Sequence, residues 1–242
     1  MSSVIKLGQI VQNYKNIEKK IEKKIIVCAG TGCIANGSMK VYEEFVNLIK
    51  KQGLGVVVEF KEEPKNEKNI HMSFSGCQGF CAKGPLVNIL PDNIFYTKVK
   101  VEDVAEIVEK TIIKNEVVER LVYTDPVSEK KYVSIDEIPF YKQQNRLVLG
   151  ECGVVNPEII DEYISHGGYL AAYKSYSELS DEQIIKTIID SGLRGRGGGG
   201  FSTGKKWEFC RIEKSDKKYI ICNGDEGDPG AFMDRSLMEG NP

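Results

Sequence analysis

Features that would point to a membrane, a secreted fold or a nucleic acid are missing from this sequence. No apolar run approaches the roughly 20 residues that a membrane-spanning helix needs. The stretch from Val4 to Ile21 is interrupted by lysines and has no apolar signal-peptide core. The formal net charge of −2 gives no support for a nucleic-acid surface. We therefore expect a cytoplasmic protein with no membrane span and no nucleic-acid partner.

Other missing features limit the roles that the cysteines can have. The seven cysteines are odd in number, and without a secretory signal they favour thiols or metal ligands over disulfides. No two of them are separated by two residues, so thiol–disulfide catalysis is not expected. The only histidines, His71 and His166, stand in plain contexts, and we expect them to be structural or surface residues.

The composition is that of a globular protein. The chain has 242 residues, of which 41% are hydrophobic and 28% charged, enough for one large or two modest domains. Residues 1–24 carry apolar side chains at helical spacing and predict an amphipathic helix that docks on its own or a partner's surface. The next ninety or so residues predict a small α/β domain. Its expected strands are residues 24–28, 55–60, 70–74, 86–90 and 94–99, and its helices are residues 39–51 and 101–114.

Four cysteines lie in two glycine-rich loops of this α/β unit. Cys28 and Cys33 are separated by four residues, and Cys77 and Cys81 by three. Four thiolates suit a [2Fe–2S] cluster, because two irons bridged by two sulfides leave two open positions each. Zinc also takes four thiolates but more often uses pairs separated by two residues. Buried structural thiols are the remaining alternative.

A second stretch of interest runs from Ser191 to Phe209. It is rich in glycine and basic residues and contains three aromatic residues. Glycine lets the backbone approach a ligand closely, and successive backbone N–H groups attract anions. Together with flat aromatic faces this suits a nucleotide, whereas a disordered linker is the alternative. Residues 181–190 before the loop predict a helix with a capping box formed by Ser180 and Gln183, so the usual strand-loop-helix dinucleotide fingerprint fails.

An acidic loop follows an expected strand at Lys218–Cys222. Residues 223–230 place Asn, Asp and Glu side chains after that strand, at the edge where α/β proteins usually bind ligands. Such acceptors would suit hydroxyl or ring N–H groups of a nucleotide; an ordinary acidic turn is the alternative. The other cysteines, Cys152, Cys210 and Cys222, match no cluster spacing, and we expect them to be buried thiols.

These motifs resemble a known family. The paired cysteines resemble those of the thioredoxin-like [2Fe–2S] ferredoxin domain of respiratory complex I. The glycine loop and the sequence Gly-Asp-Pro-Gly-Ala-Phe-Met-Asp at 227–234 resemble its FMN-binding, NADH-oxidising subunit, in the form found in NAD(P)-linked multimeric iron hydrogenases and formate dehydrogenases. The resemblance covers about residues 25–242. It implies a thioredoxin-like [2Fe–2S] domain followed by the N-terminal part of an α/β FMN-binding domain.

The resemblance also implies roles for individual residues. The cluster ligands would be Cys28, Cys33, Cys77 and Cys81. The flavin and its phosphate would be wrapped by Gly195, Arg196, Gly197 and Gly198, and FMN would be hydrogen-bonded by Asn223, Asp225 and Glu226. Lys206 would reach both nucleotides, and Phe201 and Phe209 would stack on the NADH adenine. Asp228 stands where complex I subunits usually carry glutamate near the nicotinamide. No side chain is required as a catalytic acid or base.

The implied function is that of a diaphorase subunit, which oxidises NAD(P)H through FMN and passes single electrons to iron–sulfur subunits of a larger enzyme. The family's later flavin loops and its [4Fe–4S] domain lie beyond Pro242, so we expect a fragment or a truncated product. We expect residues 25–114 to hold the cluster, residues 115–150 to be a linker, and residues 151–242 to hold FMN weakly or not at all. The alternative function is a one-electron [2Fe–2S] carrier.

Overall fold

The computed structural model describes residues 6–242, except residues 62, 63, 65, 67 and 198. The chain forms two compact units. The first contains the described residues up to His166 together with Asp225–Pro242, and the second is Gly167–Gly224. No helix among the described residues is long and apolar enough to cross a membrane.

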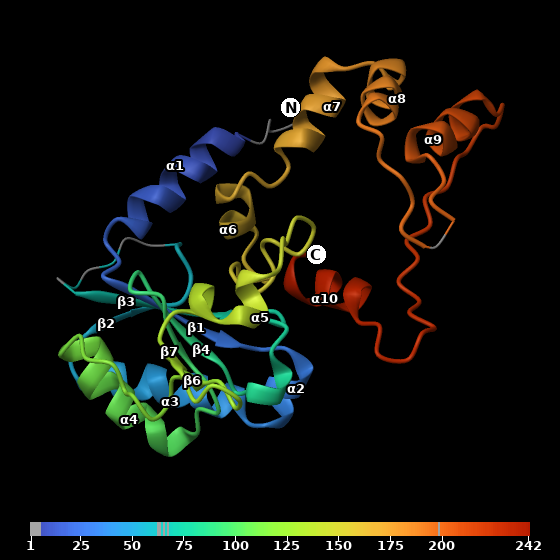
Figure 1. The fold of residues 1–242 in the computed structure, drawn as a ribbon. Helices are drawn as coiled ribbons and strands as arrows, with labels where there is room; N and C mark the ends of the chain where they lie inside the picture. The colour runs from blue at the N-terminus through green and yellow to red at the C-terminus, as the bar shows by residue number, and fades with distance from the viewer. Residues whose placement is uncertain (1–5, 62–63, 65, 67, 198) are drawn as a thin grey trace. The chain divides into compact units, whose positions relative to one another are not determined.

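The first unit is built on a five-stranded sheet with the order β2-β3-β1-β4-β5 (Figure 1). The strands β1 (Lys23–Cys28), β2 (Gly55–Val57) and β3 (Asn69–Ser75) run parallel to one another. Strands β4 (Val87–Leu90) and β5 (Ile94–Tyr96) extend the sheet in antiparallel fashion. The small α/β domain predicted from the sequence is therefore confirmed, with every expected strand present at slightly different bounds.

The two faces of this sheet differ in polarity. Ile25 and Val27 of β1 pack into the main core with helix α3 (Ser38–Lys51) and helix α4 (Val104–Ile107). Ile26 and Cys28 alternate to the opposite face, as successive residues of a strand must. That face also carries buried polar side chains, which are His71, Ser73 and Ser75 of β3 and Asn88 of β4.

The expected helix at 101–114 is three short pieces. A 3-10 turn η2 (Val101–Asp103) precedes α4, and a π-helical segment η3 (Val108–Ile113) follows it. The π-helical segment η3 carries Thr111. The Thr111 hydroxyl lies 2.6 Å from the Tyr96 hydroxyl and donates to the Glu116 carbonyl at 2.9 Å. Buried hydroxyls need such partners, and this pairing ties the end of the helix to β5.

The N-terminal helix α1 (Leu7–Glu18) buries Tyr14 and Ile17 and packs against helix α6 (Ile160–Ser165). This confirms an amphipathic helix over Leu7–Glu18, docked on the chain itself, but the expected end at residue 24 is wrong, because Lys23 and Lys24 belong to β1. Lys24 of β1 forms an ion pair with the buried carboxylate of Glu162 in α6. Four short elements lie between η3 and α6 along the chain. They are the strands β6 (Tyr123–Thr124) and β7 (Lys131–Tyr132), the 3-10 turn η4 (Ile135–Glu137) and helix α5 (Pro139–Lys142).

The second unit is helical. It contains α7 (Leu170–Glu178), α8 (Asp181–Asp190) and α9 (Thr203–Ile212), with α8 and α9 packed together. The expected strand at Lys218–Cys222 is wrong: these residues have no regular structure, and Ile220 and Ile221 are exposed. An apolar segment forms a β-strand only when a neighbouring strand pairs with it, and no described segment pairs with residues 218–222. Helices α2 (Thr31–Ala35), α5, α7 and α10 (Met233–Gly240) were not predicted.

Candidate iron–sulfur and flavin sites

The sheet brings the two pairs of cysteines together. Cys28 is the last residue of β1, and Ser75, its partner in the register, is the last residue of β3. Because β1 and β3 are parallel neighbours, the loops that leave their carboxyl ends lie side by side. Cys33 follows on α2, and Cys77 and Cys81 follow β3, with Cys81 opening the 3-10 turn η1 (Cys81–Lys83). All four predicted ligands therefore lie at one edge of the sheet.

Glycines allow these loops to touch. A Cβ atom on Gly30 would lie 2.9 Å from the Cα of Cys77, and one on Gly84 would lie 2.6 Å from the Sγ of Cys33. Real Cβ atoms do not approach other atoms so closely, so a side chain at either position would push a cysteine aside. The backbone N–H of Gly79 also donates to the Cys77 sulfur at 3.4 Å. These glycines are functional residues whose role the sequence alone does not assign.

The thiols of this edge differ in acidity. A hydrogen bond from the Cys33 thiol lowers the pKa of Cys28 to about 7, against the effect of burial, and backbone N–H groups of Gly30 and Gln78 act in the same direction. The same hydrogen bond raises the pKa of Cys33. Burial raises the pKa of Cys77 to about 11. Metal binding to such thiols requires their deprotonation and releases protons.

The four cysteines are arranged as two pairs. The sulfurs of Cys77 and Cys81 lie 3.6 Å apart, and Cys28 and Cys33 share a hydrogen bond. Within the part of the chain that the structure describes, no three cysteine, histidine or carboxylate side chains converge as ligands of a single metal ion. A zinc site would need four ligands around one point, whereas a [2Fe–2S] cluster takes two on each iron. The donor set and its pairing therefore fit the binuclear cluster.

Helix α10 lies against this cysteine edge. A Cβ atom on Gly76, next to Cys77, would lie 2.2 Å from the Cα of Gly240 at the end of α10. The Arg235 guanidinium donates to the Thr31 hydroxyl of the first cysteine loop. Cys77 and Cys81 share the lining of a cavity of about 140 Å³ with Phe232, Arg235, Ser236 and Glu239. Helix α10 thus covers Cys77 and Cys81, the more exposed pair of predicted ligands.

The glycine loop of the second unit is closed by its own backbone. The N–H of Gly195 donates to the Phe201 carbonyl at 2.8 Å, and the Arg194 guanidinium donates to the Gly200 carbonyl at 3.0 Å. Gly200 adopts a positive φ of 58°, which favours glycine. Helix α8 enters the loop, with the predicted capping box at Ser180 and Gln183 present. Helix α9 leaves it, capped by Ser202, so the loop ends at a positively polarised helix N-terminus.

The predicted nucleotide residues of this unit lie on or beside that loop. The rings of Phe201 and Phe209 are exposed, with centroids 6.3 Å apart and an angle of 44° between planes. Lys206 lies on the first turn of α9 and is exposed, as are Gly195, Arg196 and Gly197. Asn223 is in this unit, whereas Gly198 lies outside the described residues. The roles of these residues stay predictions.

The predicted carboxylates Asp225, Glu226 and Asp228 belong to the first unit. Glu226 accepts hydrogen bonds from the backbone N–H groups of Asp234 at 2.8 Å and Arg235 at 3.3 Å, so it caps the start of α10. A carboxylate there also complements the helix dipole. The sequence analysis assigned Glu226 to FMN alone and missed this contact, although the helical spacing of Met233 and Leu237 was a signal for α10.

The remaining cysteines correct one expectation. Cys152 is buried, as expected, and its thiol donates to the Ser236 carbonyl of α10 at 3.5 Å. Cys210 and Cys222 are exposed, which contradicts the expectation of buried thiols. Cys210 is part of α9, and Cys222 lies in the irregular segment that was expected to be a strand.

Comparison with known proteins assigns two stretches of the chain to families. The family model of the thioredoxin-like [2Fe–2S] ferredoxin matches residues 2–112, and that of the Nuo51 FMN-binding domain matches residues 188–242. The chain therefore contains a thioredoxin-like [2Fe–2S] ferredoxin domain followed by sequence of the Nuo51 FMN-binding domain family. The resemblance, the fold class and the two cofactors, the [2Fe–2S] cluster and FMN, are confirmed.

Curated relatives and a solved structure are similar to parts of this chain. The NADP-reducing hydrogenase subunit HndC of Solidesulfovibrio fructosivorans is 46% identical over 101 residues, which is 42% of this chain and 20% of that protein. The NAD-reducing hydrogenase HoxS subunit alpha of Cupriavidus necator is 61% identical over 64 residues, 26% of this chain and 11% of that protein. The matched regions thus cover a fifth or less of these relatives. The crystal structure of the thioredoxin-like [2Fe–2S] ferredoxin from Aquifex aeolicus is 30% identical, covering 43% of this chain and 97% of that protein, with a TM-score of 0.33.

Proposed function

We propose that this chain is the flavin and iron–sulfur portion of an NAD(P)H dehydrogenase subunit, a diaphorase that exchanges electrons between NAD(P)H and iron–sulfur partners. FMN, when bound, supplies the conversion between a two-electron hydride and single electrons. The observation that carries the proposal is the position of α10, which belongs to the FMN-domain match, against the cluster ligands Cys77 and Cys81. Sequence of the FMN-binding family therefore reaches the cysteine edge within the first unit, which supports electron exchange between a bound flavin and the cluster.

Different residues of the chain would bind different parts of the nucleotides. Backbone N–H groups of the glycine loop, with Arg196 and Lys206, would hold phosphate oxygens. Phe201 and Phe209 would stack on an adenine ring, because both rings are exposed beside the loop. Gly195, Gly197 and Gly198 would let the flavin approach the backbone, and Asn223, Asp225, Glu226 and Asp228 would hydrogen-bond the flavin or the nicotinamide.

The four cysteine thiolates would hold the cluster, two on each iron. The Gly79 N–H that already donates to the Cys77 sulfur would stabilise the reduced cluster, because hydrogen bonds to sulfur raise the reduction potential. Arg235 adds a positive charge on the same side, beside Cys77 and Cys81. None of these groups takes or gives a proton in the reaction, so the site needs no catalytic acid or base.

The wider setting is also part of the proposal. The relatives named above are subunits of NAD(P)-reducing hydrogenases, so the partners would be iron–sulfur subunits of such an enzyme. A cytoplasmic location is supported by the fact that none of the seven cysteines forms a disulfide.

Reduction of the cluster by NADH tests this function. The chain would be purified anaerobically, incubated with excess FMN, and mixed with NADH or NADPH in an electron paramagnetic resonance tube. We expect the signal of a reduced [2Fe–2S] cluster with a nicotinamide nucleotide plus FMN, and none with the nucleotide alone. A cluster that dithionite reduces but NAD(P)H with FMN does not would contradict the proposal and leave the one-electron carrier, whose complete domain the first family model supports.

A further inference from the structure

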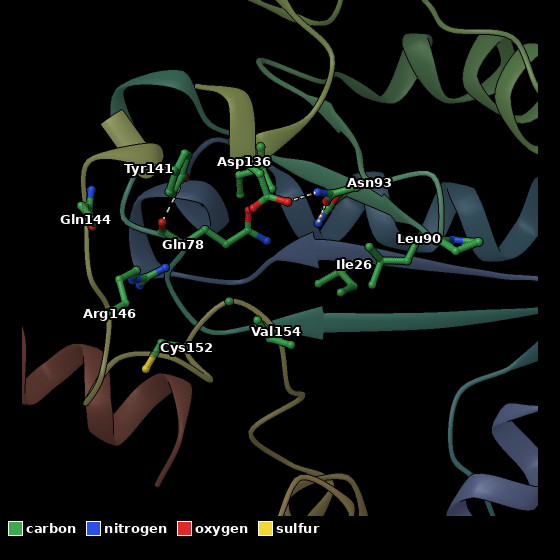
Figure 2. Close-up of a pocket in the computed structure, with 14 residues that line it drawn as sticks. Ile26, Gln78, Leu90, Asn93, Asp136, Tyr141, Gln144, Arg146, Cys152 and Val154 are labelled. Atoms are coloured by element: carbon green, nitrogen blue, oxygen red, sulfur yellow. Dashed lines mark hydrogen bonds between the residues drawn. The ribbon is translucent and has the colours of Figure 1, made fainter. Parts of the chain in front are cut away.

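A second pocket lies on the polar face of the sheet, within the first unit. It has a volume of about 560 Å³, inside the range of about 300–1,000 Å³ typical of small-molecule sites. Its apolar lining includes Ile26 of β1, Leu90 of β4 and Val154, and Tyr141 also lines it. Figure 2 shows Arg146 and Gln144 at one end, Leu90 at the other, and Gln78 between them. No nucleotide residue predicted above lines it.

Two buried amide side chains in this pocket have an atom without a partner. Gln78 is 3% exposed and Asn88 9% exposed. The Gln78 amide donates to the Ser75 hydroxyl and the Asn88 amide donates to Asn93, but the oxygen of each amide has no hydrogen-bond partner within the described chain. A buried polar atom without a partner is destabilising. Both amides therefore favour a ligand that offers hydrogen-bond donors.

The end of the pocket at Arg146 has the opposite preference. The Nε atom of Arg146 is buried and also lacks a hydrogen-bond partner among the described residues. A guanidinium group binds phosphate or carboxylate through two parallel hydrogen bonds. The Asp136 carboxylate, which would repel a second anion, lies elsewhere in the pocket and accepts from Asn93 at 2.6 Å. The pocket thus suits one anionic group, placed at the Arg146 end.

We propose that this pocket binds a nucleoside monophosphate, or an organic phosphate of the same layout. The phosphate would bind Arg146, the ribose hydroxyls would donate to the amide oxygens of Gln78 and Asn88, and the base would lie on Ile26 and Leu90. This order of charged, hydroxyl-bearing and flat parts matches the order of Arg146, Gln78 and Leu90 along the pocket in Figure 2. The site is separate from the glycine loop and does not rest on the proposed flavin reaction.

Isothermal titration of the purified chain with AMP tests the proposal. We expect AMP to bind with a Kd below about 1 mM and adenosine at least about tenfold more weakly, since adenosine lacks the anion. Arg146→Gln should weaken AMP binding at least about tenfold. Lys142→Gln is the matched control, because it removes the same charge from an exposed residue four positions away that does not line the pocket.

The outcomes separate this pocket from the glycine loop. Asn88→Leu is a second variant, which removes one amide and leaves Arg146 intact; it should weaken AMP binding and leave binding of inorganic phosphate unchanged. No binding of AMP would overturn the proposal. Equal binding by wild type and Arg146→Gln would overturn it too, because the nucleotide would then occupy another site such as the glycine loop. Neither result depends on NADH oxidation.

Discussion

Cys81 is the exposed member of the four cysteines predicted to hold the cluster, whereas Cys28 and Cys33 are fully buried. Substituting Cys81 therefore tests the cluster with the least disturbance of the core. We expect Cys81→Ala to lose most of the iron and the visible absorption of the cluster, because one iron loses a thiolate ligand. Cys210→Ala is the matched control, since Cys210 is also exposed but lies in the second unit. Equal iron content in both variants would contradict the ligand assignment.

His71 is a buried histidine that the structure holds neutral. Burial, with the nearby Lys24 ammonium, lowers the pKa of His71 to about 3, despite a hydrogen bond to the Val58 backbone that acts the other way. Its pKa in the unfolded chain is about 6.5, so the stability it contributes is present above that pH and is lost as the pH falls towards 3. At pH 5 the loss amounts to about 2 kcal/mol.

Nuclear magnetic resonance checks this directly, because the chain has only two histidines. We expect the ring resonances of His71 to stay those of a neutral imidazole from pH 8 to pH 5. His71→Phe, which fills the place beside Phe60, should make unfolding less sensitive to pH over the same range. A midpoint for His71 near 6.5 would show that the ring is solvated.

At the scale of single residues, the sequence was informative where the spacing of residues indicates a metal site. The separation of Cys28 from Cys33 and of Cys77 from Cys81 predicted two pairs, and the pairing is present. The glycines at 30, 76 and 84 were not assigned, because their role depends on which atoms of distant loops they face. The exposure of Cys210 and Cys222 was missed for the same reason: burial depends on tertiary packing that local pattern does not encode.

Among the elements, α10 is the one whose packing on the cysteine edge supports the proposed electron transfer. Gly76→Ala would place a methyl group 2.2 Å from the Cα of Gly240, so α10 must move away from the cysteine edge. We expect faster amide hydrogen exchange over residues 233–240, measured by mass spectrometry, while the cluster is retained. Gly227→Ala is the control, because nothing lies within 4 Å of its added methyl. Unchanged exchange in Gly76→Ala would contradict the packing.

The contact between α8 and α9 can be tested in the same way. A methyl group on Gly204 would lie 2.5 Å from Cγ1 and 2.7 Å from the backbone nitrogen of Ile189. We expect Gly204→Ala to destabilise the helix pair by about 1–3 kcal/mol, as overpacking usually does. Fluorescence of Trp207, the single tryptophan, reports on α9 during urea unfolding. Gly199→Ala, with open space around it, should leave the transition unchanged.

Elements with strong periodicity were predicted well. Helix α8 and its capping box follow from local sequence, and the strands β1, β3 and β4 follow from apolar runs between turn residues. The run at 218–222 has the same local character, yet forms no strand, because strand formation needs a partner. The division of residues 101–114 into three kinds of helix depends on the buried contact of Thr111 with Tyr96, which only the fold reveals.

For the whole molecule, the motifs predicted two domain families, and both are confirmed by family models. The polar pocket around Gln78 and Asn88 was not predicted. Its lining residues are spread along the sequence from Ile26 to Val154, and only the folded sheet and the loops that cover it bring them together. Domain boundaries and the roles of individual flavin residues stay predictions.

The central claim is that the four paired cysteines hold a [2Fe–2S] cluster next to the flavin-domain segment. Metal analysis of anaerobically purified chain, with its visible absorption spectrum and the paramagnetic resonance spectrum after dithionite reduction, tests it most directly. We expect about two irons per chain and the signal of one reduced binuclear cluster. One zinc per chain in a colourless protein would contradict the account.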